Sequence, residues 1–440
     1  MPPRFDADAV ATWFHAQARA RGLVGAQLGV MQEGKVTLLL QHGTLTRGGA
    51  PVLPQTPFAI GSITKQFVCA AVVLLQQQGR LTLSDRVAKY YPELTRAADI
   101  TLDDLGAHVS GYHDFYPLDF LDSRMRAPID PDALLQRYAG APLDFEPGTR
   151  FSYSNTGYIL LGRVVERVTA VPLGVWMQEH LFAPVDMTQT SLDPPASTPG
   201  LAQGHGRFAL GEPEPVPREA AGWVHAAGGI YATAADLLRW DLAIADRSLL
   251  GVDTDRLTTP RSLMSGRGTD YGCGIAVRHQ GGEVVWQHSG AVSGFLAFNA
   301  VVPRTNTAVV LLSNTETPAV AELHQELLAL VLAPPEAVPS VQGPPATEVA
   351  GTLFAQLQRG ALDRSLLAPE IAAYYDDARV QAAAPRLRAM GTPLRVEADR
   401  PRERGGLEVT SVRLVFAGRV VKAVLARRPD GVVEQFLLLE

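Results

Sequence analysis

The sequence has 440 residues, of which 46% are hydrophobic and 19% charged, and its formal net charge is −6. This composition is typical of a globular protein, and the length is too great for one ordinary domain. The negative net charge gives no reason to expect nucleic acid as a partner, and no apolar run is long enough to span a membrane.

The N-terminus and the cysteines indicate where the protein works. MPPRFDADAV carries acidic residues where a secretory signal peptide has a basic and then an apolar stretch, so we expect a cytoplasmic protein unless a misassigned start codon hides an export signal. Only Cys69 and Cys273 are present, which excludes a disulfide framework. We expect both to be free, largely buried thiols.

The N-terminal part predicts a helix and the first hairpin of an antiparallel sheet. Apolar residues recur among charged ones over 6–21, as in an amphipathic helix. Residues 24–32 and 35–41 have the pattern of two strands joined by the Glu33-Gly34 turn.

The stretch from Phe58 to Gly79 is the one around which we expect the fold to be organised. It is apolar on every side over 67–75, which predicts a helix buried all round. Gly79 supplies the left-handed stop of a C-cap. Ser62 stands at the helix start and Lys65 follows three residues later, so both side chains share one face, one turn apart.

Ser62 and Lys65 are candidates for the nucleophile and the base of a serine hydrolase. A neutral lysine within hydrogen-bond reach can take the proton of a serine hydroxyl. Its pKa, ordinarily about 10.4, must fall, which desolvation and a nearby positive charge both achieve. Arginine stays protonated and cannot replace it, and this arginine-rich chain has only four lysines. A capping serine beside a snorkelling lysine is the alternative for this motif alone.

The middle of the chain alternates helical patterns with turn-rich segments. Helices are expected over 87–91, 100–111, 151–170 and 172–184, and after an N-cap at Thr233. We expect the aromatic and proline-rich segment 112–147 to cover one side of a cleft, and 186–218 to form a long surface excursion.

Strands dominate the end of the main domain. Consecutive antiparallel strands are expected over 284–288, 296–302 and 307–312. The helix expected over 319–333 could pack on this sheet beside the N-terminal helix.

A proline-rich linker over 333–345 separates a main domain, 1–332, from a small α+β accessory domain, 346–440. In the accessory domain, helices are expected over 349–357 and 378–390, the second interrupted or kinked by Pro385, and strands over 394–398, 407–416, 419–426 and 432–439.

A second polar cluster, Tyr153-Ser154-Asn155, is the only Tyr-x-Asn in the chain. A tyrosine near a lysine ammonium can have its pKa depressed and shuttle protons to a leaving group. Asn155 could hydrogen-bond the lysine and a substrate amide. Taken singly, a capping turn before the next helix is the alternative.

The third cluster is His288-Ser289-Gly290-Ala291, at the end of a predicted strand. The backbone N–H groups of Ser62 and Ala291 could form an oxyanion hole. An ordinary strand end with a satisfied histidine is the alternative.

The order Ser-x-x-Lys, Tyr-x-Asn, His-Ser-Gly resembles the serine β-lactamase and penicillin-binding protein superfamily in its class C-like branch. The phrases FAIGSITK, YSNTGYILLGRVVE, HAAGGIYATAADLLRW and GAVSGF are similar to that family as well. The resemblance covers roughly residues 6 to 332. It implies an α+β, β-lactamase/transpeptidase-like fold, with an antiparallel sheet flanked by helices and an all-helical lobe.

The resemblance also implies roles for individual residues. Ser62 would be the acylated nucleophile, activated by Lys65, and Tyr153 the proton shuttle. The amides of Ser62 and Ala291 would stabilise the oxyanion. The full set comprises catalytic Ser62, Lys65 and Tyr153, and substrate-binding Asn155, His288, Ser289, Gly290 and Ala291. No metal or other cofactor is implied.

Two departures from the family pattern shape the predicted function. His288 stands where typical class C lactamases have lysine, which weakens a fixed positive charge for a substrate carboxylate and looks more like carboxypeptidase and D-aminopeptidase members. His108 lies where the family often has Leu-Leu-Thr-His-Thr-Ser-Gly, and we interpret it as structural. The missing signal peptide also argues against a periplasmic role in cell-wall synthesis or antibiotic resistance.

We therefore expect a serine hydrolase that cleaves amide or ester bonds of small-molecule or peptide substrates, D-amino acid derivatives among them, through an acyl-enzyme on Ser62. A β-lactamase proper and a non-catalytic penicillin-binding-like sensor are the alternatives. A metallo-hydrolase is a weaker rival because paired-histidine ligand spacing is missing, and an α/β-hydrolase is weaker still because the sequence has no G-x-S-x-G.

Overall fold

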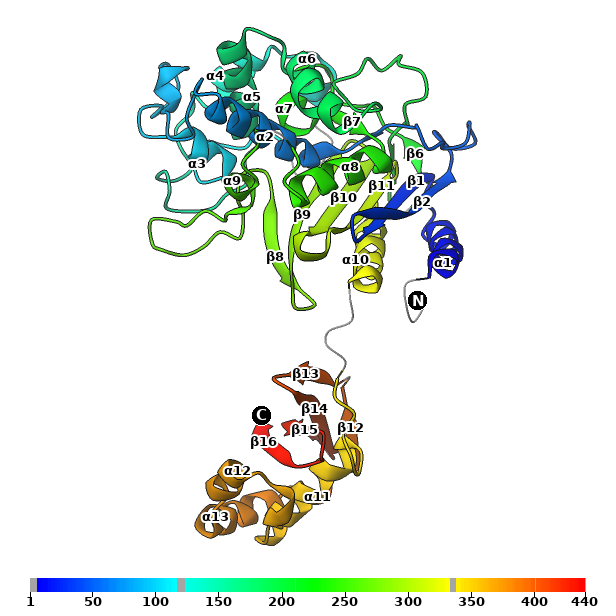
Figure 1. Cartoon of the computed structure of the whole chain (residues 1–440), viewed down its shortest axis with the longest axis vertical. Coiled ribbons are helices and arrows are strands. Elements are labelled where there is room, and N and C mark those ends of the chain that lie inside the picture. Colours follow the sequence, from blue (N-terminus) through cyan, green and yellow to red (C-terminus); the bar gives the residue numbers. More distant parts are fainter. Residues whose placement is uncertain are drawn as a thin grey trace. The chain divides into compact units, whose positions relative to one another are not determined.

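The computed structural model describes residues 6–116, 123–209, 211–249, 251–332, 338–399 and 401–439 (Figure 1). The chain divides into two compact units, Met1–Leu332 and Ala333–Glu440. Residues 333–337 of the predicted linker lie outside the described residues. Within the described ranges, no helix is both long and apolar enough to cross a membrane.

The first unit is built on a six-stranded antiparallel sheet with the order β2-β1-β11-β10-β9-β8. Its strands are β1 (Gly25–Gln32), β2 (Lys35–Gly43), β8 (Ala276–Gln280), β9 (Glu283–Val292), β10 (Phe295–Val302) and β11 (Thr307–Ser313). The N-terminal hairpin pairs with the last strand, with Ala26 opposite Ser313. The hairpin and the three later strands predicted from the sequence are confirmed.

Helices cover both faces of this sheet. On β11, Val309 and Leu311 belong to the buried cluster that contains residues of α1 (Ala7–Ala20) and α10 (Ala319–Val331). Val310 and Leu312 belong to the cluster that contains residues of α8 (Ala234–Ala245). Because successive strand residues face opposite sides, burial on both faces explains why β11 is continuously apolar.

The rest of the first unit is mainly a helical lobe, as expected. Its helices are α2 (Thr64–Gln77), α3 (Leu102–Gly106), α4 (Pro131–Tyr138), α5 (Asn155–Thr169), α6 (Leu173–Met177), α7 (His225–Gly228) and α9 (Thr254–Thr258). Single helical turns are η1 (Gly61–Ile63), η2 (Val87–Lys89), η3 (Ser123–Arg126), η4 (Gln178–Phe182), η5 (Ala183–Val185) and, in the β10–β11 connection, η6 (Pro303–Thr305).

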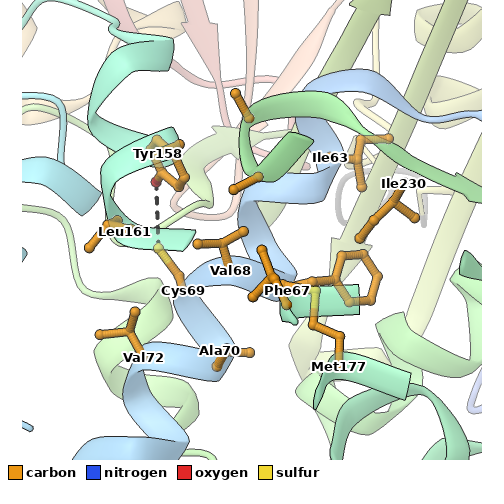
Figure 2. Packing of buried hydrophobic residues seen from close by; sticks show 14 of the residues in the cluster. Ile63, Phe67, Val68, Cys69, Ala70, Val72, Tyr158, Leu161, Met177 and Ile230 are labelled. Carbon is orange, nitrogen blue, oxygen red and sulfur yellow. Dashed lines mark hydrogen bonds between the residues drawn. The ribbon is translucent and has the colours of Figure 1, made fainter. Parts of the chain in front are cut away.

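Helix α2 lies at the centre of this lobe. Every residue over 64–75 is buried, as its apolar pattern predicts. Figure 2 shows its side chains packed among those of neighbouring elements, including Tyr158 and Ile230. Gly79 follows with a φ of +69°, and its N–H donates to Gln76 O, which confirms the left-handed stop. A helix held on all sides fixes the position of the turn before it, which carries Ser62.

The expectation of two free thiols is wrong. Cys69 of α2 and Cys273, which is 204 positions further along the chain, form a disulfide. The sulfur of Cys69 also lies 3.5 Å from the Tyr158 hydroxyl (Figure 2). The pairing exists because the segment before β8 packs against α2, a tertiary contact without a local sequence signal. The disulfide ties the helix that carries Lys65 to that segment.

Three short strands lie among the described residues of the surface excursion predicted over 186–218. These are β4 (Ser191–Leu192), β5 (His205–Gly206) and β6 (Glu214–Pro215). β4 joins β3 (Phe58–Ala59) and β7 (Ile230–Ala232) in a small sheet, and β5 pairs with β6. The predicted N-cap is confirmed, because the Thr233 side chain accepts from Asp236 N–H at the start of α8.

The second unit packs helices on a separate antiparallel sheet. Its helical elements are α11 (Ala346–Arg359), η7 (Arg364–Leu366), α12 (Pro369–Tyr374) and α13 (Asp377–Arg388), and its strands are β12 (Arg395–Ala398), β13 (Arg402–Arg404), β14 (Leu407–Phe416), β15 (Arg419–Arg427) and β16 (Val433–Leu439). Phe354, Leu414 and Phe436 are among its core residues. Pro385 lies inside α13 without ending the helix.

Candidate active site

Ser62 and Lys65 meet across one helical turn. Ser62 lies in η1, which runs directly into α2, and Lys65 is the second residue of α2. The Nζ atom of Lys65 lies 2.9 Å from Ser62 Oγ. The side chain of Lys65 is completely buried. The spacing seen in the sequence therefore places an amine with no solvent exposure against the hydroxyl of Ser62.

The other two partners of the Lys65 amine can only accept hydrogen bonds. They are Asn155 Oδ1, at 2.8 Å, and the carbonyl oxygen of Ala227, at 2.6 Å. A neutral amine has two hydrogens and one lone pair. If the two hydrogens go to Asn155 and Ala227, the lone pair is left for the Ser62 hydroxyl.

Burial makes the neutral form of Lys65 accessible. Desolvation lowers the pKa of Lys65 to about 7, and the carboxylate of Asp114 opposes this shift. Of the two causes named from the sequence, desolvation is the one that acts here, and the charged group that acts on Lys65 is an acid. The amine is therefore a usable base near neutral pH because it is desolvated.

Tyr153 lies just before α5 and faces the amine. The Lys65 Nζ atom is 4.9 Å from the centroid of the Tyr153 ring. Burial raises the pKa of Tyr153 well above its usual value, and the neighbouring Ser62 hydroxyl lowers it only in part. The depressed pKa expected from the sequence is therefore wrong. Tyr153 is a neutral phenol at neutral pH, able to donate a proton.

The amide of Asn155, the first residue of α5, is held by Asp114. Asp114 Oδ1 accepts from the backbone N–H of Asn155 at 2.9 Å and from Asn155 Nδ2 at 3.1 Å. A carboxylate only accepts, so Nδ2 faces Asp114 and Oδ1 faces Lys65.

The residues over 288–291 lie within a strand and not at its end, because β9 continues to Val292. β8 pairs only with residues 283–287 of β9. The stretch 288–292 is therefore bonded to β10 on one side, while its other edge lies against η1.

Two glycines allow η1 and β9 to approach this closely. A Cβ atom on Gly290 would lie 1.9 Å from Ile60 O, and one on Gly61 would lie 2.7 Å from the backbone nitrogen of Ala291. Gly61 also has a φ of +50°, which other residues rarely adopt. Any side chain at either position would separate Ser62 from Ala291.

Ser62 and Ala291 border one small cavity. Its volume is about 30 Å³, and Asn155, Ala227 and Tyr116 line it as well. This is room for a group of about the size of one water molecule. A carbonyl oxygen placed between the two backbone segments would fit such a space.

The side chain of His288 is fully engaged by the protein. Its Nδ1 lies 2.6 Å from Ser289 O and its Nε2 lies 2.8 Å from the Tyr271 hydroxyl. A carbonyl only accepts, so Nδ1 carries the hydrogen and Tyr271 donates to Nε2. Burial, and to a lesser degree Lys65, lowers the pKa of His288 to about 3. The ring is neutral and offers no free N–H to a ligand.

His108 packs against this site, which is consistent with the structural role expected from the sequence. Its ring stacks on that of Tyr153 with centroids 4.1 Å apart. Two other side chains of the site were not predicted. Asp114 and Tyr271 lie in irregular segments without a motif, so only the fold reveals their contacts with Asn155 and His288.

A family model described as Beta-lactamase matches residues 10–333. The putative penicillin-binding protein PbpX of Bacillus subtilis (strain 168) is 25% identical over 284 residues, which cover 60% of this chain and 64% of that protein. This chain thus spans slightly less than two thirds of that relative. The D-aminopeptidase of Gluconobacter oxydans (strain 621H) is 28% identical over 403 residues, covering 86% of this chain and 74% of the relative.

The fold also matches solved structures. The D-amino acid amidase from Ochrobactrum anthropi SV3, complexed with L-phenylalanine amide, aligns with a TM-score of 0.63 and 23% identity over 73% of this chain and 98% of that one. The β-lactamase-like α+β fold expected from the sequence is confirmed.

Proposed function

Because the chain belongs to the beta-lactamase family, we propose that it is a serine hydrolase that cleaves amide bonds through an acyl-enzyme on Ser62. The observation that carries the proposal is the buried amine of Lys65, 2.9 Å from Ser62 Oγ, with two acceptor-only partners for its hydrogens. A nucleophile, a base and groups that orient the base are the parts that such a reaction needs.

Acylation begins with the neutral form of Lys65. The amine takes the proton of Ser62 while Oγ forms a bond to the substrate carbonyl carbon. The carbonyl oxygen becomes an oxyanion in the small cavity, where the N–H groups of Ser62 and Ala291 donate to it. Stabilising charge that appears only in the transition state is what raises the rate.

Tyr153 serves the second half of acylation. When the carbon–nitrogen bond breaks, the Tyr153 phenol donates its proton to the leaving amine, and the Lys65 ammonium replaces that proton. Lys65 is then neutral again. In deacylation, a water molecule attacks the ester, its proton passes to this pair, and one proton returns to Ser62 Oγ.

Amides of D-amino acids and short peptides that contain them are the substrate class we propose. The relatives named D-aminopeptidase and D-amino acid amidase support this class. His288 supports peptidase or amidase chemistry over β-lactam hydrolysis, because its neutral ring offers no fixed positive charge to a substrate carboxylate. Esters would follow the same path.

Covalent labelling and turnover test the proposal together. We expect a fluorophosphonate to add one adduct on Ser62, found by peptide mass spectrometry, and D-aminoacyl p-nitroanilides to be hydrolysed faster than L-aminoacyl ones. Ser62→Ala should abolish both, while Ser84→Ala, at an exposed serine, should change neither. An adduct without turnover of any amide, ester or nitrocefin would favour a sensor, and unchanged hydrolysis by Ser62→Ala would overturn the mechanism.

A further inference from the structure

Asp114 accepts hydrogen bonds from both donor groups of Asn155, the backbone N–H and the side-chain Nδ2. Its Oδ1 accepts from the backbone N–H and from Nδ2, and its Oδ2 lies 3.3 Å from the same Nδ2. The backbone N–H of Tyr116 donates to Oδ1 as well, at 3.2 Å, which holds the carboxylate in place. Asp114 does not contact Ser62 or Lys65 by a hydrogen bond, so any role in the reaction runs through Asn155.

The orientation of the Asn155 amide decides what the Lys65 lone pair can do. The two ends of an amide, O and NH₂, are alike in shape but opposite in hydrogen bonding. With Oδ1 toward Lys65, the amide accepts a hydrogen and leaves the lone pair for Ser62. With Nδ2 toward Lys65, the amide would donate into that lone pair, and the amine could no longer accept the Ser62 proton.

We propose that Asp114 is a positioning residue that selects the Asn155 orientation in which Lys65 can act as a base toward Ser62. The proposal rests on the proposed function and adds a fourth member to the chain of contacts Ser62, Lys65, Asn155. The reversed amide would turn Oδ1 toward the carboxylate of Asp114, so two acceptors would meet without a hydrogen between them. That arrangement is unfavourable, because it leaves two oxygen acceptors in contact and the Asn155 side chain without its hydrogen bond to Asp114.

Asp114 also sets the charge around Lys65. The titratable side chains that surround the amine come from several elements: His108 after α3, Tyr153 and Tyr158 before and within α5, and His288 on β9. Burial lowers the pKa of both imidazoles and raises the pKa of both phenols, so all four are neutral near pH 7. The Asp114 carboxylate acts against desolvation and raises the pKa of Lys65.

A purely structural role for Asp114 predicts a different outcome. Ser154, the N-cap of α5, makes no capping hydrogen bond with its side chain, and Asp114 accepts from the first N–H of that helix instead. A carboxylate at a helix N-terminus stabilises it. Its loss would then lower the melting temperature without changing kcat or the pH profile of the folded enzyme.

The test compares two substitutions in the full chain. Asp114→Ala removes the acceptor, and we expect kcat to fall roughly 10- to 100-fold with KM changed less than about threefold, as for loss of an oriented general base. Asp114→Asn keeps an oxygen for Asn155 Nδ2, so most of kcat should return. Since its charge is lost, the acidic limb of kcat/KM should move to lower pH by roughly one unit.

Asp144→Ala is the matched control. This aspartate faces the exposed His113 and has no contact with Asn155, so kcat and the acidic limb should stay at parental values. Melting temperatures of all variants separate folding defects from kinetic ones. If Asp114→Ala does not fold, the expected shift of the acidic limb in Asp114→Asn still decides the matter.

Three results would overturn the proposal. One is a folded Asp114→Ala with parental kcat and pH profile, another is equal loss of kcat in the Ala and Asn variants, and the third is an unshifted limb in Asp114→Asn. Ser62→Ala separates this proposal from the proposed function. If Ser62→Ala is inactive while Asp114→Ala is fully active, only the role of Asp114 fails.

Discussion

The Nζ atom of Lys65 lies 2.6 Å from the carbonyl oxygen of Ala227, and this contact joins α2 to α7 beside Ser62. A carbonyl can only accept, so one hydrogen of the amine always points toward α7 and away from the nucleophile. The start of α7 is anchored in turn, because His225 Nδ1 lies 2.7 Å from Asp193 Oδ2. The direction of the Lys65 lone pair is thus set by backbone from a distant part of the chain.

Replacing Lys65 by arginine should abolish acylation. Arginine keeps its charge at any pH the protein survives, so no base remains beside Ser62. We expect at least about a 10³-fold loss of kcat/KM in Lys65→Arg, with no fluorophosphonate adduct on Ser62. Lys89→Arg is the matched control, since the Lys89 side chain is 53% exposed and pairs with Asp85. A fully active Lys65→Arg enzyme would contradict the mechanism.

The pH dependence of kcat/KM should follow the ionisation of Lys65. Its pKa is lowered to about 7, so the neutral fraction rises from about one tenth at pH 6 to about nine tenths at pH 8. Activity should therefore rise with pH through a limb near 7 and then level off. Because burial raises the pKa of Tyr153, no descending limb should come from its phenol below about pH 10. A rising limb near 10 instead would mean that Lys65 is not desolvated.

The Cys69–Cys273 disulfide should stabilise the first unit. It closes a loop across 204 positions, which restricts the unfolded chain. We expect reduction to lower the free energy of unfolding by about 2–4 kcal/mol, measured by urea unfolding with and without dithiothreitol. The double variant Cys69→Ala/Cys273→Ala should not respond to the reductant. Two titratable thiols in the denatured, unreduced protein would show that the bond does not form.

Asp241 should make the stability depend on pH. It is completely buried in α8, with Asn299 Nδ2 at 2.8 Å from Oδ1 and no partner for Oδ2 among the described residues. Burial raises the pKa of Asp241 to about 8, and the bond from Asn299 opposes this only in part. The folded state therefore binds this proton more tightly than the unfolded state, whose pKa is about 3.9.

The stability from that proton is present in full below about pH 4 and is lost as the pH rises to about 8. Asp241→Asn should remove this loss, so its advantage over the parent should grow from pH 4 to 8 and then stay constant, with an upper bound of about 6 kcal/mol. Denaturation curves across this range provide the measurement. Asp8→Asn, at an exposed position of α1, should show no such trend. A constant difference between Asp241→Asn and the parent would rule out this ionisation.

The sequence was enough to predict the relationships that depend on spacing along the chain. Ser62 and Lys65 share a helix face because they are three residues apart, and the all-apolar pattern of α2 predicts its burial. The strand-like composition of these stretches and the turns between them predicted the hairpin and the later strands in the same way. These features are local, so the residues themselves carry the information.

The tertiary structure decided the properties that depend on what surrounds a group. The sequence suggested that the pKa of Tyr153 falls, but burial of the phenol raises it. The pKa of the neighbouring Lys65 is lowered to about 7, so its amine does not provide the fixed positive charge that would lower the pKa of the phenol. Cys69 and Cys273 are bonded, and Asp114 orients Asn155, because segments distant in the chain are brought into contact. Burial and long-range partners leave no periodic trace in a sequence, so only the folded chain determines which base Ser62 meets and in what state of charge.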